Sequence, residues 1–253
     1  MTKLFSFFIL ISFFINVEAQ NVIHEQKEIH EIYNSKKFNR DSAYVIDVTW
    51  PVFDENKGNT KFAVKLNELV TSLLPASKAD VKETVVDMIE TYKSMEQEED
   101  FGMYWTFTSD IGAYFPTDNI VSIVKTEWEY AGGAHGNGVT IYYNVDESTH
   151  KVLTLDDLLI PGGKEKLNAI ADKIFRHDYE IGEDEPLDEA GFWFVNNKFA
   201  LNENFLIDNG ALQFTFNSYE IAPYAAGAPE VRIKFSDFKD IIRKDGPLKY
   251  WFE

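Results

Sequence analysis

The sequence of 253 residues contains no cysteine. A chain without cysteine cannot form a disulfide, cannot carry a lipid on an N-terminal cysteine and cannot use a thiol as a nucleophile. Its stability must therefore come from its core. Aromatic residues, which make up 15% of the sequence, can supply much of the buried area.

Long apolar runs are also scarce. The one long run, residues 4–15, follows Lys3 and ends shortly before Ala19. It is too short for a membrane-spanning helix, which needs about 20 residues. Its basic start and the small residue after it are typical of a secretory signal peptide. We therefore expect residues 1–19 to be cleaved off and the chain to be exported, periplasmic or secreted, with no membrane span after cleavage. An uncleaved N-terminal anchor is the alternative.

Positive charge is outnumbered throughout the chain. There are 24 lysines and arginines against 42 aspartates and glutamates, which gives a formal net charge of −18. Nucleic acid and anionic lipid would be repelled, so neither is expected as a partner. Opposite charge accelerates association with a cationic partner. The same acidity also keeps an exported protein soluble, so charge alone leaves both explanations open.

Hydrophobic periodicity predicts a mixture of strands and helices. Alternation over residues 44–50 predicts a strand that ends at Pro51, and apolar spacing predicts amphipathic helices at residues 62–73 and 81–92, separated near Pro75. Further strands are expected at residues 103–107, 120–130, 139–145, 199–207, 211–216 and 231–235, and further helices at residues 164–179 and 236–243. Asp208, Asn209 and Gly210 are typical of a hairpin turn. This mixed order favours an α+β fold with a largely antiparallel sheet and helices packed on one side.

Few residues are arranged for catalysis. The five histidines show no metal-binding spacing, so neither a metal nor another cofactor is expected; they are His24, His30, His135, His150 and His177. A Gly-x-Ser-x-Gly motif is absent as well. Two carboxylate pairs could act as acid and base, Asp156 with Asp157 and Glu220 with Glu230. Such pairs arise by chance in an acidic chain, so a carboxylate-dependent hydrolase stays an alternative function.

The glycine loop, residues 132–138, is the most unusual stretch. It lies between two predicted strands and lacks the lysine and the serine or threonine of a phosphate-binding loop. One interpretation is a sharp strand connection in which His135 hydrogen-bonds the local backbone. The other is a recognition loop, in which Gly132, Gly133 and Gly136 allow close backbone approach while His135 and Asn137 contact a ligand.

The tyrosine loop, residues 218–227, is the second unusual stretch. Tyr219 and Tyr224 flank Pro223 among small residues, and Glu220 adds a carboxylate. Tyrosine offers contact area and a hydroxyl at low entropic cost, as binding surfaces require. The loop therefore predicts either a binding surface or a lid of two rings over one end of the sheet. If it is a binding surface, we expect it to converge with the glycine loop on one exposed face.

Ordered motifs extend over most of the chain. Residues 130–137 read Tyr-Ala-Gly-Gly-Ala-His-Gly-Asn, residues 143–146 Tyr-Asn-Val-Asp, residues 153–158 Leu-Thr-Leu-Asp-Asp-Leu and residues 219–227 Tyr-Glu-Ile-Ala-Pro-Tyr-Ala-Ala-Gly. Together they resemble the extracytoplasmic domain of RsiV-like anti-sigma factors. Residues 48–53, Val-Thr-Trp-Pro-Val-Phe, are similar to the domain that precedes the catalytic unit of PdaC-like peptidoglycan deacetylases. The resemblance predicts a PdaC-like region at residues 20–140 and an RsiV-like region at residues 141–253, which we expect to form one compact unit.

The resemblance implies a domain at the cell envelope. In RsiV-like proteins this region binds lysozyme, a strongly basic protein, and the charge of −18 suits such a partner. Because the sequence shows no deacetylase unit and none of its metal ligands, we expect a non-catalytic, exported binding module whose partner is a cationic protein such as lysozyme. The alternative is a module that binds peptidoglycan or another glycan through exposed rings such as Trp128, Trp193 or Tyr224.

Overall fold

The computed structural model describes residues 13–14, 22–76, 78, 80–98 and 103–251. The predicted signal peptide, residues 1–19, lies outside these residues except for Phe13 and Phe14. Among the helices within the described ranges, none combines the length and the apolar character that crossing a membrane requires.

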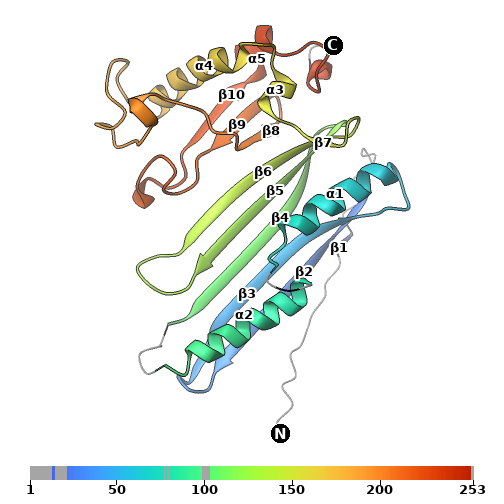
Figure 1. Cartoon of the computed structure of the whole chain (residues 1–253), viewed down its shortest axis with the longest axis vertical. Helices are drawn as coiled ribbons and strands as arrows, with labels where there is room; N and C mark the ends of the chain where they lie inside the picture. The colour runs from blue at the N-terminus through green and yellow to red at the C-terminus, as the bar shows by residue number, and fades with distance from the viewer. Residues whose placement is uncertain (1–12, 15–21, 77, 79, 99–102, 252–253) are drawn as a thin grey trace. The chain divides into compact units, whose positions relative to one another are not determined.

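Within the described ranges, ten strands form two sheets (Figure 1). The larger sheet has the order β1-β2-β3-β4-β5-β6-β7, with β1 (Phe13–Phe14), β2 (His24–Ser35), β3 (Arg40–Phe53), β4 (Trp105–Thr117), β5 (Ile120–Tyr130), β6 (Asn137–Asp146) and β7 (Lys151–Val152). β3 and β4 pair in parallel, since two helices separate them in the chain. The smaller sheet has the antiparallel order β10-β9-β8, with β8 (Phe205–Asp208), β9 (Ala211–Thr215) and β10 (Glu230–Lys234). The predicted α+β class is confirmed.

The residues that the structure describes also form five α-helices: α1 (Thr60–Leu73), α2 (Val81–Met95), α3 (Leu155–Leu158), α4 (Gly163–Asp178) and α5 (Phe235–Phe238). α1 begins where the Asn59 side chain accepts the N–H of Phe62, and α2 begins where the Asp80 side chain accepts the N–H of Glu83. Short 3-10 helices lie at Val195–Asn197, Tyr224–Ala226, Lys239–Ile241 and Lys249–Trp251. The two helices predicted on either side of Pro75 are therefore confirmed.

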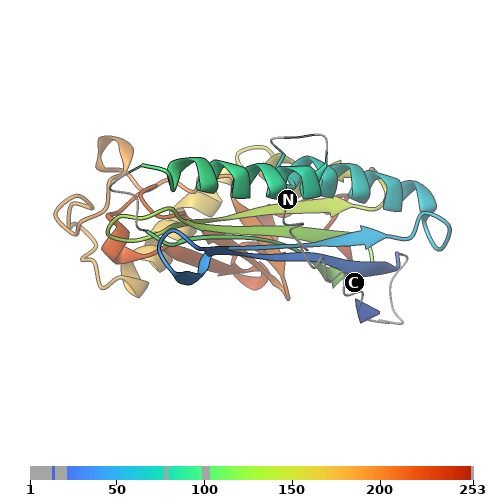
Figure 2. The ribbon, with the colours of Figure 1, turned by 90° about the horizontal axis from the view of Figure 1, so that it is seen from below.

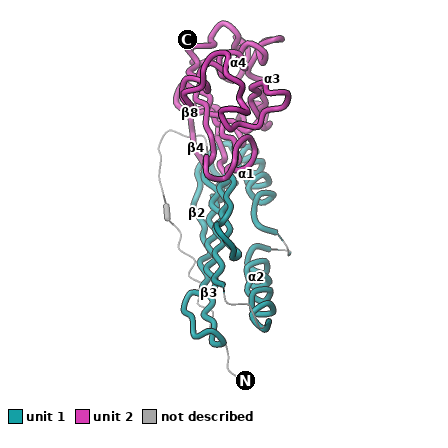
Figure 3. The backbone as a smooth tube through the Cα atoms, turned by 90° about the vertical axis from the view of Figure 1, so that its left-hand side faces the viewer, with its two compact units in different colours: residues 1–112, 125–139 teal, residues 113–124, 140–253 magenta. Residues whose placement is uncertain are grey.

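The chain forms two compact units (Figure 3). Unit 1 comprises Met1–Gly112 and Lys125–Val139, and unit 2 comprises Ala113–Val124 and Thr140–Glu253. This division differs from a single cut after residue 140, because β4, β5 and β6 each contribute residues to both units. The assignment of residues 20–140 and 141–253 to two regions stays a prediction from the motifs.

The core of unit 1 lies between helices and sheet. α1 and α2 cover one face of the sheet at β2 and β3 (Figure 2). Tyr92 of α2 is fully buried and contacts the rings of Tyr33, Tyr44 and Trp105, with centroids 5.6, 5.5 and 5.2 Å away. Its hydroxyl donates to the carbonyl of Met103 at 2.7 Å. These contacts fix α2 against the sheet.

The core of unit 2 is built around α4, which packs against β10. Phe175 is fully buried there, and four rings surround it within 4.6 to 5.6 Å between centroids: Tyr179, Phe192, Phe194 and Phe199. Three of these rings belong to residues 180–204, a segment without strands or α-helices. The aromatic contacts therefore fold a long connection onto the helix.

Three predicted strands have wrong ends. The strand predicted at residues 103–107 is β4, which continues to Thr117. Pro51 lies inside β3, opposite Gln26, and not at its end. The pairing with β4 stops at Thr49 and Asp110, so a residue without an N–H removes no bond to β4 at this position.

Residues 199–204 are also not a strand, since β8 begins at Phe205. Asn168 of α4 supplies the bonds that a neighbouring strand would give. Its amide donates to the carbonyl of Phe199 at 3.0 Å, and its oxygen accepts the N–H of Leu201 at 2.8 Å. A side chain thus satisfies this backbone without a sheet.

Candidate functional site

The glycine loop of unit 1 is stabilised by local hydrogen bonds, and its polar side chains are exposed to solvent. Gly132 and Gly133 adopt φ of 94° and 96°, the left-handed region that favours glycine. The Tyr130 hydroxyl donates to the carbonyl of Gly133 at 3.0 Å, and Nδ1 of His135 lies 2.8 Å from the carbonyl oxygen of Gly136. His135 and Asn137 are both exposed. The loop therefore has the local backbone bond of the first interpretation and the accessible side chains of the second.

Close packing also explains why residue 136 is a glycine. A side-chain carbon at this position would meet Cζ2 of Trp128 at 2.5 Å and the carbonyl oxygen of Glu129 at 2.7 Å. The glycine therefore lets the start of β6 pass close to Trp128.

The tyrosine loop of unit 2 also exposes most of its predicted residues, and Tyr224 is half-buried. Tyr219 has a φ of 68° and is 50% exposed, and its ring lies 5.8 Å from the ring of Tyr224. Pro223 and Glu220 are exposed. The Glu220 carboxylate accepts the amide of Asn202 and the backbone N–H of Asn217, both at 2.9 Å. The loop thus presents two adjacent rings beside a carboxylate of fixed orientation.

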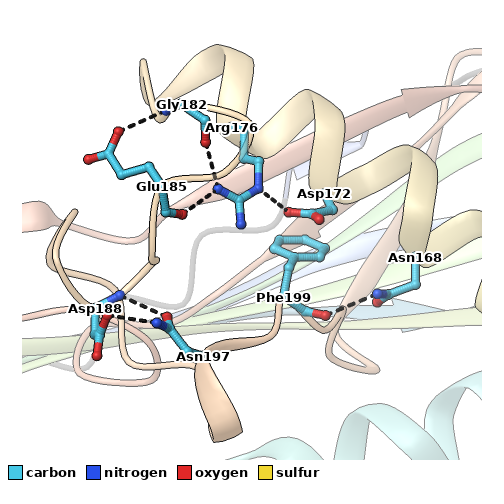
Figure 4. Close-up of polar contacts among 8 residues, drawn as sticks. All are labelled: Asn168, Asp172, Arg176, Gly182, Glu185, Asp188, Asn197 and Phe199. Atoms are coloured by element: carbon cyan, nitrogen blue, oxygen red, sulfur yellow. Dashed lines mark hydrogen bonds and ion pairs between the residues drawn. The ribbon is translucent and has the colours of Figure 1, made fainter.

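Residues 180–204 form a further candidate surface that depends on polar contacts from α4 (Figure 4). Arg176 donates from Nε to Asp172 at 3.0 Å and from Nη1 to the carbonyl oxygens of Gly182 at 2.9 Å and Glu185 at 2.8 Å. Farther along, the Asn197 amide donates to the Asp188 carboxylate at 2.7 Å. Long connections without regular structure often carry function when they are ordered in this way.

The exposed end of that segment adjoins the tyrosine loop within unit 2. Trp193 is 52% exposed and Val195 is 82% exposed. The N–H of Trp193 donates to the carbonyl of Ile221 at 2.7 Å. Trp193 and Glu220 line one groove of about 360 Å³ together with Ile221. Trp193 of that segment and Glu220 of the tyrosine loop therefore border the same groove.

A second groove of about 460 Å³ shares Asn202 and Glu220 with the first. Its lining includes Tyr142, Tyr143 and Asn144 of β6, together with Asn202, Asn204 and Asn217. We call Asn144, Asn202, Asn204 and Asn217 the amide cluster.

The amide cluster bonds β6 to the smaller sheet through side chains. Asn217 accepts the N–H of Thr140 at 2.7 Å, and Asn204 accepts the N–H of Tyr142 at 3.0 Å. Asn204 also donates to the carbonyl oxygens of Thr140 at 2.8 Å and Thr215 at 3.0 Å. The cluster therefore replaces backbone pairing along this part of β6.

The carboxylate pair Asp156 and Asp157 serves structural contacts. Asp156 pairs with Lys164 at 3.1 Å. Asp157 accepts the backbone N–H and the hydroxyl of Thr154, both at 2.8 Å, at the start of α3. The Thr154 backbone bond holds the pKa of Asp157 below its usual value, and a general acid would need a raised pKa. This geometry favours a helix cap over an acid–base pair.

Asp157 should accordingly contribute a pH-dependent stabilisation. Because its pKa is lower in the folded chain, the contribution is present above the unfolded pKa of about 4 and is lost as the pH falls through the folded value. Asp157→Asn is expected to cost about 1 kcal/mol at neutral pH, measured by urea unfolding, and to converge with the parent at low pH. Asp156→Asn, the matched neighbour, should cost less. Equal losses at both pH values would contradict the cap.

Histidine and acidic side chains form no obvious metal centre within the described ranges, where no group of three or more is placed to hold an ion. His24 is partly buried, and burial lowers its pKa. His30 contacts Asp47, and His177 lies 3.0 Å from Asp178. The expectation that the chain uses no metal or cofactor stays a prediction.

The predicted contact residues fall into two groups. The glycine loop belongs to unit 1, and the tyrosine loop belongs to unit 2. Their convergence on one face therefore stays a prediction. Within unit 2, the structure adds Trp193 as a neighbour of the tyrosine loop and Asn202 as the residue between two grooves. No strand or helix is predicted over residues 180–198, and this long gap is the sequence signal for this surface.

Comparison with known proteins also divides the chain into an N-terminal and a C-terminal region. Residues 38–138 match the family described as "Deacetylase PdaC", and residues 156–236 match the family described as "Protein of unknown function (DUF3298)". A curated relative, the peptidoglycan-N-acetylmuramic acid deacetylase PdaC of Bacillus subtilis, is 30% identical over 126 residues, which cover 49% of this chain and 26% of the relative. The chain thus spans about a quarter of that relative's length.

Two solved structures have a similar fold. A DUF3298 family member from Bacteroides fragilis has a TM-score of 0.72 at 22% identity, over 90% of this chain and 95% of that chain. A DUF3298 family protein from Pseudomonas aeruginosa has a TM-score of 0.61 at 19% identity, over 88% of this chain and 94% of that chain. At these identities the likeness concerns the fold alone. The chain is thus similar to the PdaC family over residues 38–138 and to the DUF3298 family over residues 156–236.

Proposed function

We propose that this chain is a binding module of the cell envelope that recognises a cationic protein such as lysozyme, without catalysis of its own. The PdaC-like region supports an envelope role, because the curated relative is named for an enzyme of peptidoglycan. The resemblance of residues 130–158 and 219–227 to RsiV-like domains supports lysozyme as the partner. Export through the predicted signal peptide belongs to the same proposal.

One observation carries the choice of a protein partner, namely the aromatic surface around Glu220 in unit 2. Trp193 and Tyr219 are each about half exposed, and Tyr224 lies beside Tyr219. Tryptophan and tyrosine are enriched among the residues that dominate binding energy at interfaces. The fixed Glu220 carboxylate offers a bond to a lysine or arginine of the partner. The overall charge of −18 increases the rate of encounter with a basic protein.

Titration of lysozyme onto the immobilised chain at several salt concentrations tests the proposal. Binding should weaken as salt rises, because screening reduces attraction between opposite charges. Tyr219→Ala should weaken binding by about thirtyfold, the loss typical of an interface hot spot. Tyr250→Ala is the matched control, since Tyr250 is also about half exposed but lies outside the tyrosine loop. His135→Ala tests whether the glycine loop takes part. The absence of binding at low salt would remove lysozyme as the partner.

A glycan is the second candidate ligand, and the groove of about 460 Å³ favours it. The groove is lined by Tyr142, Tyr143, Asn202 and Glu220 among others, and aromatic and polar residues together suit the apolar faces and hydroxyls of a sugar. Sedimentation with insoluble cell wall separates the two candidates. Retention on the wall that salt does not reverse would favour the glycan, and a chain that stays in the supernatant would favour the protein partner.

A further inference from the structure

Most of β2 lies at an open edge of the larger sheet. β2 pairs with β3 from His24 to Ser35, whereas β1 pairs only with Glu25 and Gln26 on the other side. From Lys27 to Ser35, no residue that the structure describes pairs with that second side. In a strand, alternate N–H and C=O groups point to each side, so this edge offers a row of backbone bonds to another strand.

Glu31 is an unusual residue for such an edge. It is only 7% exposed and faces the core of unit 1, where its register partner is the buried Ile46. Its Oε1 atom has no hydrogen-bond partner within the described part of the chain. Burial raises the pKa of this carboxyl, and the nearby His30 opposes that shift. A buried carboxylate oxygen without a partner is costly, and a cation beside it would offset the cost.

Lys27 is the cation on the same face of β2. It precedes Glu31 by four residues, about 13 Å along a strand, so the two side chains do not pair within one chain. Its nearest acidic contact is Glu25, at 3.8 Å. If two β2 strands lie antiparallel with Ile29 opposite Ile29, each Lys27 comes opposite the Glu31 of the other chain. Directly opposed residues have their Cβ atoms about 5 Å apart, which allows an ion pair.

The charges of β2 select this register over its neighbours. A register centred on Glu28 places Glu25 opposite Glu31, which sets two negative charges against each other. A register centred on His30 places Ile29 opposite Glu31, which leaves the carboxylate without a cation. Charged residues on an edge strand commonly prevent pairing with other strands. In β2, the charged residues disfavour the shifted registers, whereas Lys27 and Glu31 form pairs of opposite charge in the register centred on Ile29.

We propose that β2 is the interface for a second copy of this chain, with the two strands antiparallel about Ile29 and Lys27 of each chain bonded to Glu31 of the other. The two larger sheets then continue into each other through backbone hydrogen bonds. The dimer contains the Lys27–Glu31 pair twice by symmetry, so each single substitution changes two contacts.

Sedimentation equilibrium of the purified full chain tests the proposal. The parent should form a concentration-dependent dimer. Lys27→Glu and Glu31→Lys should each raise the dimer dissociation constant about tenfold or more, because two like-charge pairs replace two ion pairs. An equal mixture of the two variants should recover dimers within about threefold of the parent, because each variant carries the charge that the other requires.

The mixture also distinguishes a loss of strand pairing from a loss of folding. Mixing two variants can restore a pairing of charges, but it cannot restore the fold of a chain that does not fold. Circular dichroism of each variant checks the fold, and Glu31→Gln provides a neutral replacement if Glu31→Lys does not fold; it should weaken the dimer less than Lys27→Glu. A parent chain that stays monomeric at all concentrations would overturn the proposal. So would a dimer that neither charge reversal weakens, or a mixture that does not recover it.

Discussion

Phe175→Ala is expected to lower the free energy of unfolding by about 3 to 5 kcal/mol, the largest loss of any single substitution considered. Phe175 is fully buried on α4, and four aromatic rings contact it. Removal of its ring leaves a cavity that these large neighbours cannot fill without leaving their rotamers. Urea unfolding followed by circular dichroism measures the loss.

Lys173→Ala is the control for this substitution, since Lys173 is exposed on the same helix and should change stability by no more than about 0.5 kcal/mol. Three of the rings around Phe175 belong to residues 180–204, so the variant should also become sensitive to limited proteolysis near Trp193. A loss below 1 kcal/mol, with no new cleavage, would show that the segment is held by its polar contacts alone.

Asn144→Ala is expected to cost about 3 kcal/mol or more, because it leaves several buried groups without partners. Asn144 is 1% exposed. Its oxygen accepts the Ser122 hydroxyl at 2.8 Å and the N–H of Ile207 at 2.9 Å, and its amide donates to the carbonyl of Phe205 at 2.7 Å. The exposed Asn137 is the matched control, and its replacement by alanine should change stability little.

Asn144→Asp distinguishes the lost amide from a general change in side-chain volume. The new carboxylate keeps an acceptor for Ser122 and Ile207 but directs a second oxygen at the carbonyl of Phe205. Burial raises the folded pKa of such a carboxyl, so the penalty is largest above that pKa and falls as the pH is lowered through it. A stability difference that does not depend on pH would contradict the assigned hydrogen bonds.

The sequence allowed the regular elements to be predicted where local signals dominate. β5 spans Ile120–Tyr130, as its β-branched residues predict. The hairpin at Asn209 and Gly210 has φ of 36° and 80°, as the residues of that turn require. The helices α1 and α2 follow from apolar spacing and from the break near Pro75. In each case the residues that decide the structure are close together in the chain.

The remaining features depend on residues that are far apart in the sequence. Residues 180–204 are ordered by Arg176 and Asn168 of α4, and neither produces a periodic pattern in the segment that it binds. The amide cluster joins residues 140–144 to residues 202–217, and an asparagine in a loop gives no sign of a distant partner. The sequence identifies Trp193 only as a ring that could contact a glycan, and the fold places it in the same groove as Glu220.

The amide cluster has a consequence for how this architecture can vary during evolution. Backbone pairing between two strands imposes a residue-by-residue alignment, so a single insertion moves every later side chain to the opposite face. Attachment through side chains imposes no such alignment. A loop beside β8 and β9 can become longer or shorter, provided that its asparagine side chains still reach the backbone of β6 and hydrogen-bond it. Homologous chains can therefore remodel the walls of the groove of about 460 Å³ while β6 keeps its place.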